Sequence, residues 1–174
     1  AATAQVSTRT NPLRNAYFGD LHVHTEFSFD AYLFGTRRTP DDAYDFAKGA
    51  AIEHVSGFRM QMKKPLDFLA VTDHGFLLGM MKTMADPGST YSKHEIADAV
   101  RGATDAAGSG AAFQAVLGYF GRLTAEGREI DIDDRTVMRD AWQKIAAAAE
   151  RHNDPGTFTT FIGYEYTTSG PEFQ

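Results

Sequence analysis

Three apolar segments of this chain each end in side chains that can bind metals, and this repeated pattern limits the folds open to it. Segment 16–24 reads AYFGDLHVH, segment 65–75 reads PLDFLAVTDHG, and segment 158–165 reads FTTFIGYE. Each has the length and the apolar character of a strand. A helical pattern follows the first segment and leads towards the second, which is typical of parallel strands joined by crossover helices. The sequence therefore predicts an α/β fold.

The first segment carries two histidines at alternate positions. Because side chains alternate across a strand, Asp20, His22 and His24 are expected on one face, with Leu21 and Val23 packed on the other. A single pair of this kind is more often a pair of surface or hydrogen-bonded histidines than half of a metal site. The metal interpretation gains weight because the other two segments repeat the pattern.

The ends of the three segments together supply His22, His24, Asp73, His74 and Glu165. In parallel α/β sheets, ligands and catalytic groups gather where the strands end, because the loops there vary while the strands hold position. Imidazole and carboxylate donors without a thiolate suit Zn, Mn or Fe in a hydrolytic or redox role. The chain has no cysteine, which excludes a cysteine-ligated structural zinc site.

Composition narrows the classes of partner. The 174 residues are 43% hydrophobic and suffice for one globular domain, and the formal charge of −6 argues against nucleic acid as the main partner. Arg37–Arg38 and Lys63–Lys64 are either local anion contacts or solvated loop charge.

No apolar run approaches the roughly 20 residues of a membrane span. The first residue, Ala1, fits a periplasmic or secreted protein after signal-peptide removal, and equally a trimmed or cytoplasmic chain.

The remaining sequence is mainly helical in pattern. Residues 1–15 form a polar lead-in that we expect to be flexible. Thr39-Pro-Asp-Asp42 begins a helix whose buried face is expected at Ala43, Phe46, Ala47 and Ala50. The stretch 53–64 is irregular.

We expect a helical insertion over about residues 76–153. Its first helix follows a capping box at Ser92–Glu95 and ends at Gly108–Gly110, and a second helix contains Phe113, Leu117 and Phe120. A third runs from about Asp134 to Arg151 and buries Met138, Ala141, Trp142, Ile145 and Ala149. A simple crossover needs only about a dozen residues. The additional residues form either a lid or a substrate-binding wall over the strand ends, or an insertion that only adds packed helices to the core.

The motifs resemble those of the PHP superfamily, the metal-dependent phosphoesterases named for polymerase and histidinol phosphatase. Residues 20–30, DLHVHTEFSFD, are similar to its HxH signature followed by Ser and Asp. Residues 72–75 are similar to its second motif, and 161–165 to the strand that supplies a bridging glutamate. Segments 17–24, 39–44 and 65–74 resemble, more narrowly, large bacterial proteins catalogued only as a domain of unknown function.

The resemblance implies that residues 16–174 form the N-terminal part of a distorted (β/α) barrel of PHP type, with the helical insertion. It also implies two or three divalent ions at the strand ends. The implied ligands are His22, His24, Asp30, His74 and a bridging Glu165. Asp20 and Asp73 match positions that orient imidazoles, and Arg37 or Arg38 would clamp the substrate anion.

The chain also departs from the family pattern. Further histidines and an Asp-x-His pair of the family have no counterpart here, and Phe76-Leu-Leu-Gly79 stands where many relatives have an acidic residue. Relatives in the narrower group are several times longer. We therefore expect the chain to be part of a longer polypeptide, or to be completed by another segment.

These features predict a hydrolase that cleaves a small anionic phosphoester with metal-activated water. Sulfate or phosphonate esters would suit the same centre. The alternative is a non-catalytic metal-binding or scaffolding part of a larger assembly. His54, His94 and His152 are expected to lie outside the centre, and Ser28 is expected to be a hydrogen-bonding loop residue and not a nucleophile.

Overall fold

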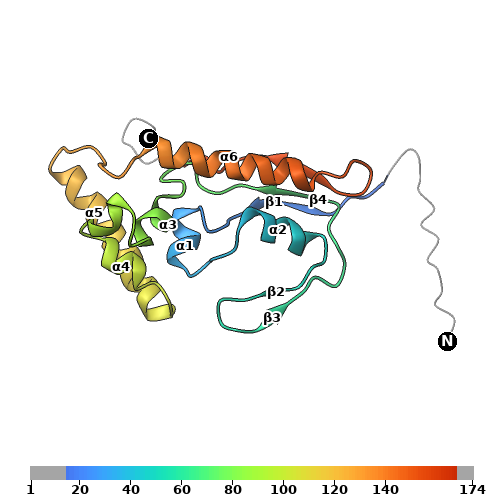
Figure 1. The fold of residues 1–174 in the computed structure, drawn as a ribbon, viewed down its shortest axis with the longest axis horizontal. Coiled ribbons are helices and arrows are strands. Elements are labelled where there is room, and N and C mark those ends of the chain that lie inside the picture. The colour runs from blue at the N-terminus through green and yellow to red at the C-terminus, as the bar shows by residue number, and fades with distance from the viewer. Residues whose placement is uncertain (1–14, 168–174) are drawn as a thin grey trace.

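The structure is a computed structural model that describes residues 15–167. It is a mixed α/β fold with a parallel three-stranded sheet, as the sequence predicts (Figure 1). In chain order the elements are β1 (Gly19–Val23), α1 (Phe29–Leu33), α2 (Pro40–Ala47), β2 (Ile52–Glu53), β3 (Arg59–Met60), β4 (Phe68–Val71), α3 (Met80–Ala85), the 3-10 helix η1 (Thr90–Lys93), α4 (Ala97–Arg101), α5 (Ala106–Ala125), α6 (Arg135–His152) and β5 (Thr159–Ile162).

The three predicted strands pair with one another in the order β1-β4-β5. β4 lies in the centre, and its last three residues are buried, as expected of a strand with neighbours on both sides. Leu69 lies opposite Asp20 of β1 and opposite Thr160 of β5. Because all three strands are parallel, their C-terminal ends meet at one edge of the sheet.

Helices α2 and α6 cover one face of this sheet. Tyr44 of α2 and Ile145 of α6 are fully buried in the same apolar cluster as Leu69 and Val71 of β4. The N-terminus of α2 has the predicted cap, since the Thr39 side chain accepts a hydrogen bond from the Asp42 N–H. The predicted buried face of α2 is partly wrong, because Tyr44 is buried whereas the expected Ala50 is exposed.

The remaining helices form a second apolar cluster beside the sheet layer. It contains residues of α1, α3, α4 and α5, and Figure 1 shows these helices grouped at one end of the molecule. The predicted insertion over 76–153 therefore divides into two parts. Helices α3 to α5 build the second cluster, whereas α6 is the crossover helix that returns the chain to β5 along the sheet.

Two helix boundaries differ from the prediction. Gly108 and Gly110 do not end a helix but lie in the first turns of α5, which the Asp105 side chain caps by accepting from the Gly108 N–H. Glycine is favoured at position 108 because a Cβ atom there would clash with the Gly102 carbonyl oxygen. Ser92 does not cap a helix, because its hydroxyl donates to the Ser89 carbonyl within η1.

The alternation predicted for β1 is also interrupted. The pairing register of β1 with β4 shifts between Asp20 and Val23. Asp20 lies opposite Leu69 and Val23 lies opposite Val71, and both of these β4 residues are buried. Val23 packs against the sheet–helix cluster as expected, but Leu21 is 57% exposed. The expectation that Leu21 packs in the core is therefore wrong, and the irregular register of an edge strand accounts for the difference.

The irregular stretch after α2 contains a small antiparallel hairpin of β2 and β3. Figure 1 shows this hairpin extending away from the sheet, beneath α2. Among residues 15–167, no helix combines the length and the apolar character that crossing a bilayer requires.

Candidate metal centre

The site forms where the parallel strands end. His22 lies on β1 and His24 directly follows it, while His74 and Glu165 follow β4 and β5. An isolated parallel bridge between His74 and Glu165 extends the ladder beyond the regular strands and fixes these two backbones side by side. Asp30 enters from the first turn of α1. The structure thus brings together all five residues that the resemblance implied as ligands.

The Glu165 carboxylate contacts three histidines, His22, His24 and His74. Its Oε2 atom lies 2.9 Å from His22 Nε2 and 2.7 Å from His24 Nε2. His74 Nε2 is 3.7 Å from the same oxygen. Three imidazoles therefore face one carboxylate oxygen.

Asp30 is a second carboxylate that contacts two of these histidines, His24 and His74. Its Oδ1 atom lies 3.3 Å from His24 Nδ1, and its Oδ2 atom lies 3.4 Å from His74 Nε2. Two groups of donors result: His22, His24 and Glu165 in one, and His24, Asp30 and His74 in the other, each with its ligand atoms within 4.8 Å of one another. His24 belongs to both groups.

The donor set fits a divalent metal. Ligands bound at about 2.1 Å to one tetrahedral ion lie about 3.4 Å apart, and the donor atoms of each group lie within 4.8 Å of one another, so small side-chain movements would bring them around an ion. The side chains of His24 and His74 are 16% and 12% exposed, whereas that of His22 is 69% exposed. The centre is therefore enclosed on the side of His74 and open to solvent at His22.

The electrostatics of the centre favour charged carboxylates. Burial alone would raise the pKa of Asp30, but hydrogen bonds from His24, Ser28 and the Ala31 N–H lower the pKa well below its ordinary range. Hydrogen bonding to Asp30 is the main reason that the pKa of His24 is raised. Metal ligation requires the ionised carboxylate and a neutral imidazole, so an ion bound at Asp30 and His24 would displace the proton that this hydrogen bond holds.

Ser28 holds the carboxylate in place. Its buried hydroxyl donates to Asp30 Oδ1 at 2.6 Å and accepts from the His74 N–H at 3.2 Å. This is the hydrogen-bonding role expected from the sequence. The contact ties the loop after β1 to the loop after β4.

The sequence did not point to Thr167 or Thr25. Thr167 Oγ1 lies 2.5 Å from His74 Nδ1, and a hydrogen bond at Nδ1 leaves Nε2 of the same ring free for a metal. Thr25 binds Asp73 through its N–H and its hydroxyl, the latter at 2.7 Å. The position of Thr25 directly after the second histidine of the HxH pair is the signal that could have identified it.

Asp73 and Asp20 act on the backbone and not on an imidazole. Asp73 is fully buried, and burial raises its pKa despite its two hydrogen bonds from Thr25. Through Thr25 it fixes the chain next to His24. The Asp20 carboxylate accepts from the His22 N–H at 2.9 Å. Both aspartates therefore position the HxH segment through its main chain.

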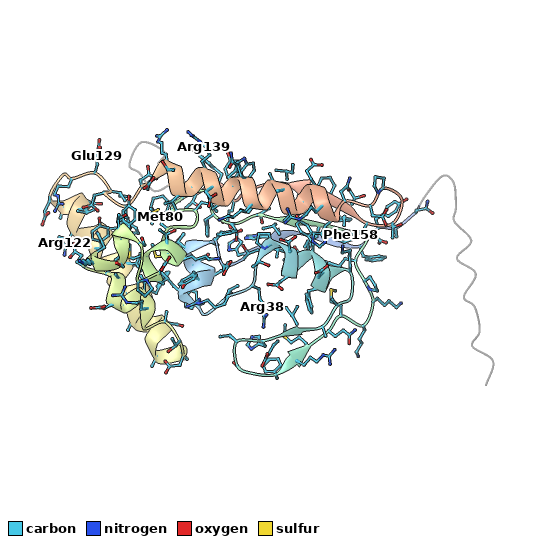
Figure 2. All side chains as sticks on the ribbon, in the orientation of Figure 1. Arg38, Met80, Arg122, Glu129, Arg139 and Phe158 are labelled. Atoms are coloured by element: carbon cyan, nitrogen blue, oxygen red, sulfur yellow. The ribbon has the colours of Figure 1, made fainter. Side chains whose placement is uncertain are left out.

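Arg37 bonds to backbone carbonyls and to none of the five donors in the described residues. Its guanidinium donates to the carbonyls of Tyr32 and Ala103 and lies 3.6 Å from the centre of the Tyr32 ring. Arg38 donates to the Glu53 carbonyl of β2, and Figure 2 shows it between the sheet layer and the hairpin. The structure thus gives both arginines backbone partners, and neither touches a donor of the centre in the described part of the chain.

The other histidines lie elsewhere, as expected. His54 stacks on Phe58 within the hairpin. His94 contacts Asp131, and His152 at the end of α6 contacts Asp41 of α2.

Comparison with known proteins gives one match. The sequence model of a family described as "Protein of unknown function (DUF3604)" matches residues 11–173, almost the whole chain. No curated protein and no solved structure matches it. The chain therefore belongs to the DUF3604 family.

Proposed function

We propose that this protein is a metal-dependent phosphoesterase of PHP type that acts on small anionic esters. The observation that carries the proposal is the convergence of three imidazoles and two carboxylates from three strand ends and α1. Such a set, without a thiolate, is typical of hydrolytic Zn, Mn or Fe centres. The two donor groups, which share His24, give two candidate positions for an ion, and Glu165 belongs to the first of them.

Each residue has a definite part in this proposal. His22, His24, Asp30, His74 and Glu165 would hold the ions. Bound divalent ions supply a water of lowered pKa and offset the charge that develops on the phosphoryl oxygens. The exposed side of the centre at His22 admits the ester, while Thr167 and Ser28 keep His74 and Asp30 oriented.

A barrel of PHP type has more strands than the sheet described here. A closed α/β barrel takes about eight strands, and residues 15–167 form three parallel strands. Both edge strands carry half-exposed apolar side chains, Leu21 on β1 and Phe161 on β5. We propose that further strands, from a longer polypeptide or another segment, complete the sheet.

A non-catalytic metal-binding role is the second candidate. It is favoured by the number of donors, because the described residues offer five and both groups depend on His24. Centres of two or three ions generally use more ligands. Sulfate and phosphonate esters remain alternative substrates of the same centre.

Metal analysis combined with hydrolysis assays separates the two candidates. The chain, alone and together with the polypeptide that completes its sheet, is loaded with Zn²⁺ or Mn²⁺ and tested on p-nitrophenyl phosphate and bis(p-nitrophenyl) phosphate, with His24→Ala as the variant and His94→Ala as the control. We expect turnover by the wild type and by His94→Ala, and its loss together with the metal in His24→Ala. Retained metal without turnover would favour the non-catalytic role, whereas turnover by metal-stripped His24→Ala would contradict both.

A further inference from the structure

A cavity of about 700 Å³ opens beside the donor cluster, between β1, α2 and the β2–β3 hairpin. Cavities of this size hold small organic molecules. Most of the side chains that line it are apolar, among them Phe46, Ile52, Val55, Met60, Leu66 and Leu69. Several of them, among them Phe46, Met60 and Leu66, are only half-buried, so the cavity leaves apolar surface in contact with water.

His24 connects the cavity to the donor cluster. It lines the cavity, and its Nε2 atom lies 2.7 Å from Glu165. A molecule whose anionic group sits at the cluster can therefore extend its remaining part past His24 into the cavity.

The charges on the cavity wall balance one another. Arg37 and Arg38 line it, and so do the carboxylates of Asp20 and Glu53. Both guanidiniums already donate to backbone carbonyls, Arg38 to that of Glu53. A balanced wall of this kind gives no net attraction for an anion, whereas its apolar majority favours an uncharged apolar group.

Two other cavities of the described residues lack this combination. The one between α2 and α6, about 380 Å³, is lined by Lys82, Lys144 and Arg151 together with acidic residues, and no donor of the centre borders it. The cavity of about 410 Å³ beside Trp142 and Tyr164 likewise contains none of the five donors.

We infer that the cavity beside His24 binds the apolar part of the substrate, an aryl or alkyl group esterified to the phosphate. The inference rests on the proposed function for the position of the phosphate and adds the class of alcohol. Substrates with a bulky apolar alcohol are then preferred over methyl esters, because only the former bury apolar surface against Phe46, Met60 and Leu66.

Calorimetric titration with two non-hydrolysable anions tests this inference without relying on turnover. The Mn²⁺-loaded chain is titrated with 1-naphthylphosphonate and with methylphosphonate. We expect the naphthyl compound to bind at least tenfold more tightly. Val55→Glu, which places a charge on the exposed part of the cavity wall, should abolish most of this ratio. Leu117→Glu is the matched control, because Leu117 is a similarly exposed apolar residue on α5 and outside the cavity; it should leave the ratio unchanged.

The ratio of the two affinities separates the apolar contribution from any effect of the new charge on the anionic group. Equal affinities in the wild type overturn the inference, and so does a preference that survives in Val55→Glu. Equal affinities are also the result if a second copy or another polypeptide fills the cavity. Naphthyl-selective binding without hydrolysis of any ester would contradict the proposed function and leave the binding inference standing.

Discussion

His24 is the residue on which the proposed centre depends most. It faces Glu165 through Nε2 and Asp30 through Nδ1, and it is part of both donor groups. His22, by contrast, belongs to one group and is largely exposed. The HxH pattern predicted both side chains, but it could not rank them, because the ranking follows from the position of α1 across the strand ends.

We therefore predict that His24→Ala weakens metal binding more than His22→Ala. The affinity should fall by more than about 100-fold in His24→Ala, beyond the 10- to 100-fold typical of residues that only orient a ligand. Competition with a chelating dye measures both affinities. Equal losses in the two variants would show that His24 does not serve two groups.

Thr167 gives a second prediction, which concerns the orientation of His74. Thr167→Val removes the hydrogen-bonding partner of His74 Nδ1 while keeping the shape of the side chain. Metal affinity should fall by about 10- to 100-fold, and Thr167→Ser should restore most of it. An unchanged affinity in the valine variant would mean that the His74 ring keeps its orientation without Thr167, for example through Asp30.

Secondary-structure elements were predictable where periodicity and capping agree. The strands, the Thr39 cap and the course of α6 are confirmed, because each combines a clear apolar pattern with a start or stop signal. The start of α5 was not predictable, since glycine ordinarily weakens a helix. At Gly108 the close Gly102 carbonyl, a tertiary contact, decides in favour of glycine.

The two glycines of α5 test this explanation as a matched pair. A Cβ atom at Gly110 meets nothing within 4 Å, so Gly110→Ala should stabilise the protein by about 0.5–1 kcal/mol through helix propensity. Gly108→Ala should destabilise it, because its Cβ atom would clash with the Gly102 carbonyl oxygen. Urea unfolding of both variants gives the comparison, and stabilisation by Gly108→Ala would contradict the packing of α4 against α5.

The contact between α2 and α6 predicts a pH dependence. Slight burial alone would raise the pKa of Asp41, but hydrogen bonds from Arg151 and His152 lower it below its ordinary value of 3.8. A carboxyl with a lowered pKa in the folded state stabilises the protein above its unfolded pKa. This stabilisation is lost as the pH falls through the lower, folded pKa.

Asp41→Asn should therefore cost stability at pH 7 and almost none near pH 2. The cost should not exceed about 1 kcal/mol, because the side chains of Asp41 and Arg151 are 44% and 55% exposed. Asp140→Asn, which removes a pair with Lys144 within α6, is the control and should have a smaller effect. A cost that persists at pH 2 would assign the effect to packing and not to charge.

The whole molecule consists of a sheet layer and a group of helices beside it, joined around the strand ends. Periodicity predicted the α/β class and an insertion, but not that α6 belongs to the sheet layer. That assignment depends on Ile145 and Ala149 being buried in one apolar cluster with Tyr44 and with Leu69 and Val71 of β4, which lie far away in the sequence. The edge that carries the site was predictable, because parallel strands must bring their C-terminal ends together.

Anomalous diffraction from crystals soaked in Zn²⁺ or Mn²⁺ tests the central claim, a metal centre at this edge, most directly. We predict a peak about 2 Å from the ring nitrogens of His22 and His24 and from Glu165, and a second peak among His24, Asp30 and His74. A map without peaks at these positions, with the imidazoles still hydrogen-bonded to the two carboxylates, would contradict the account.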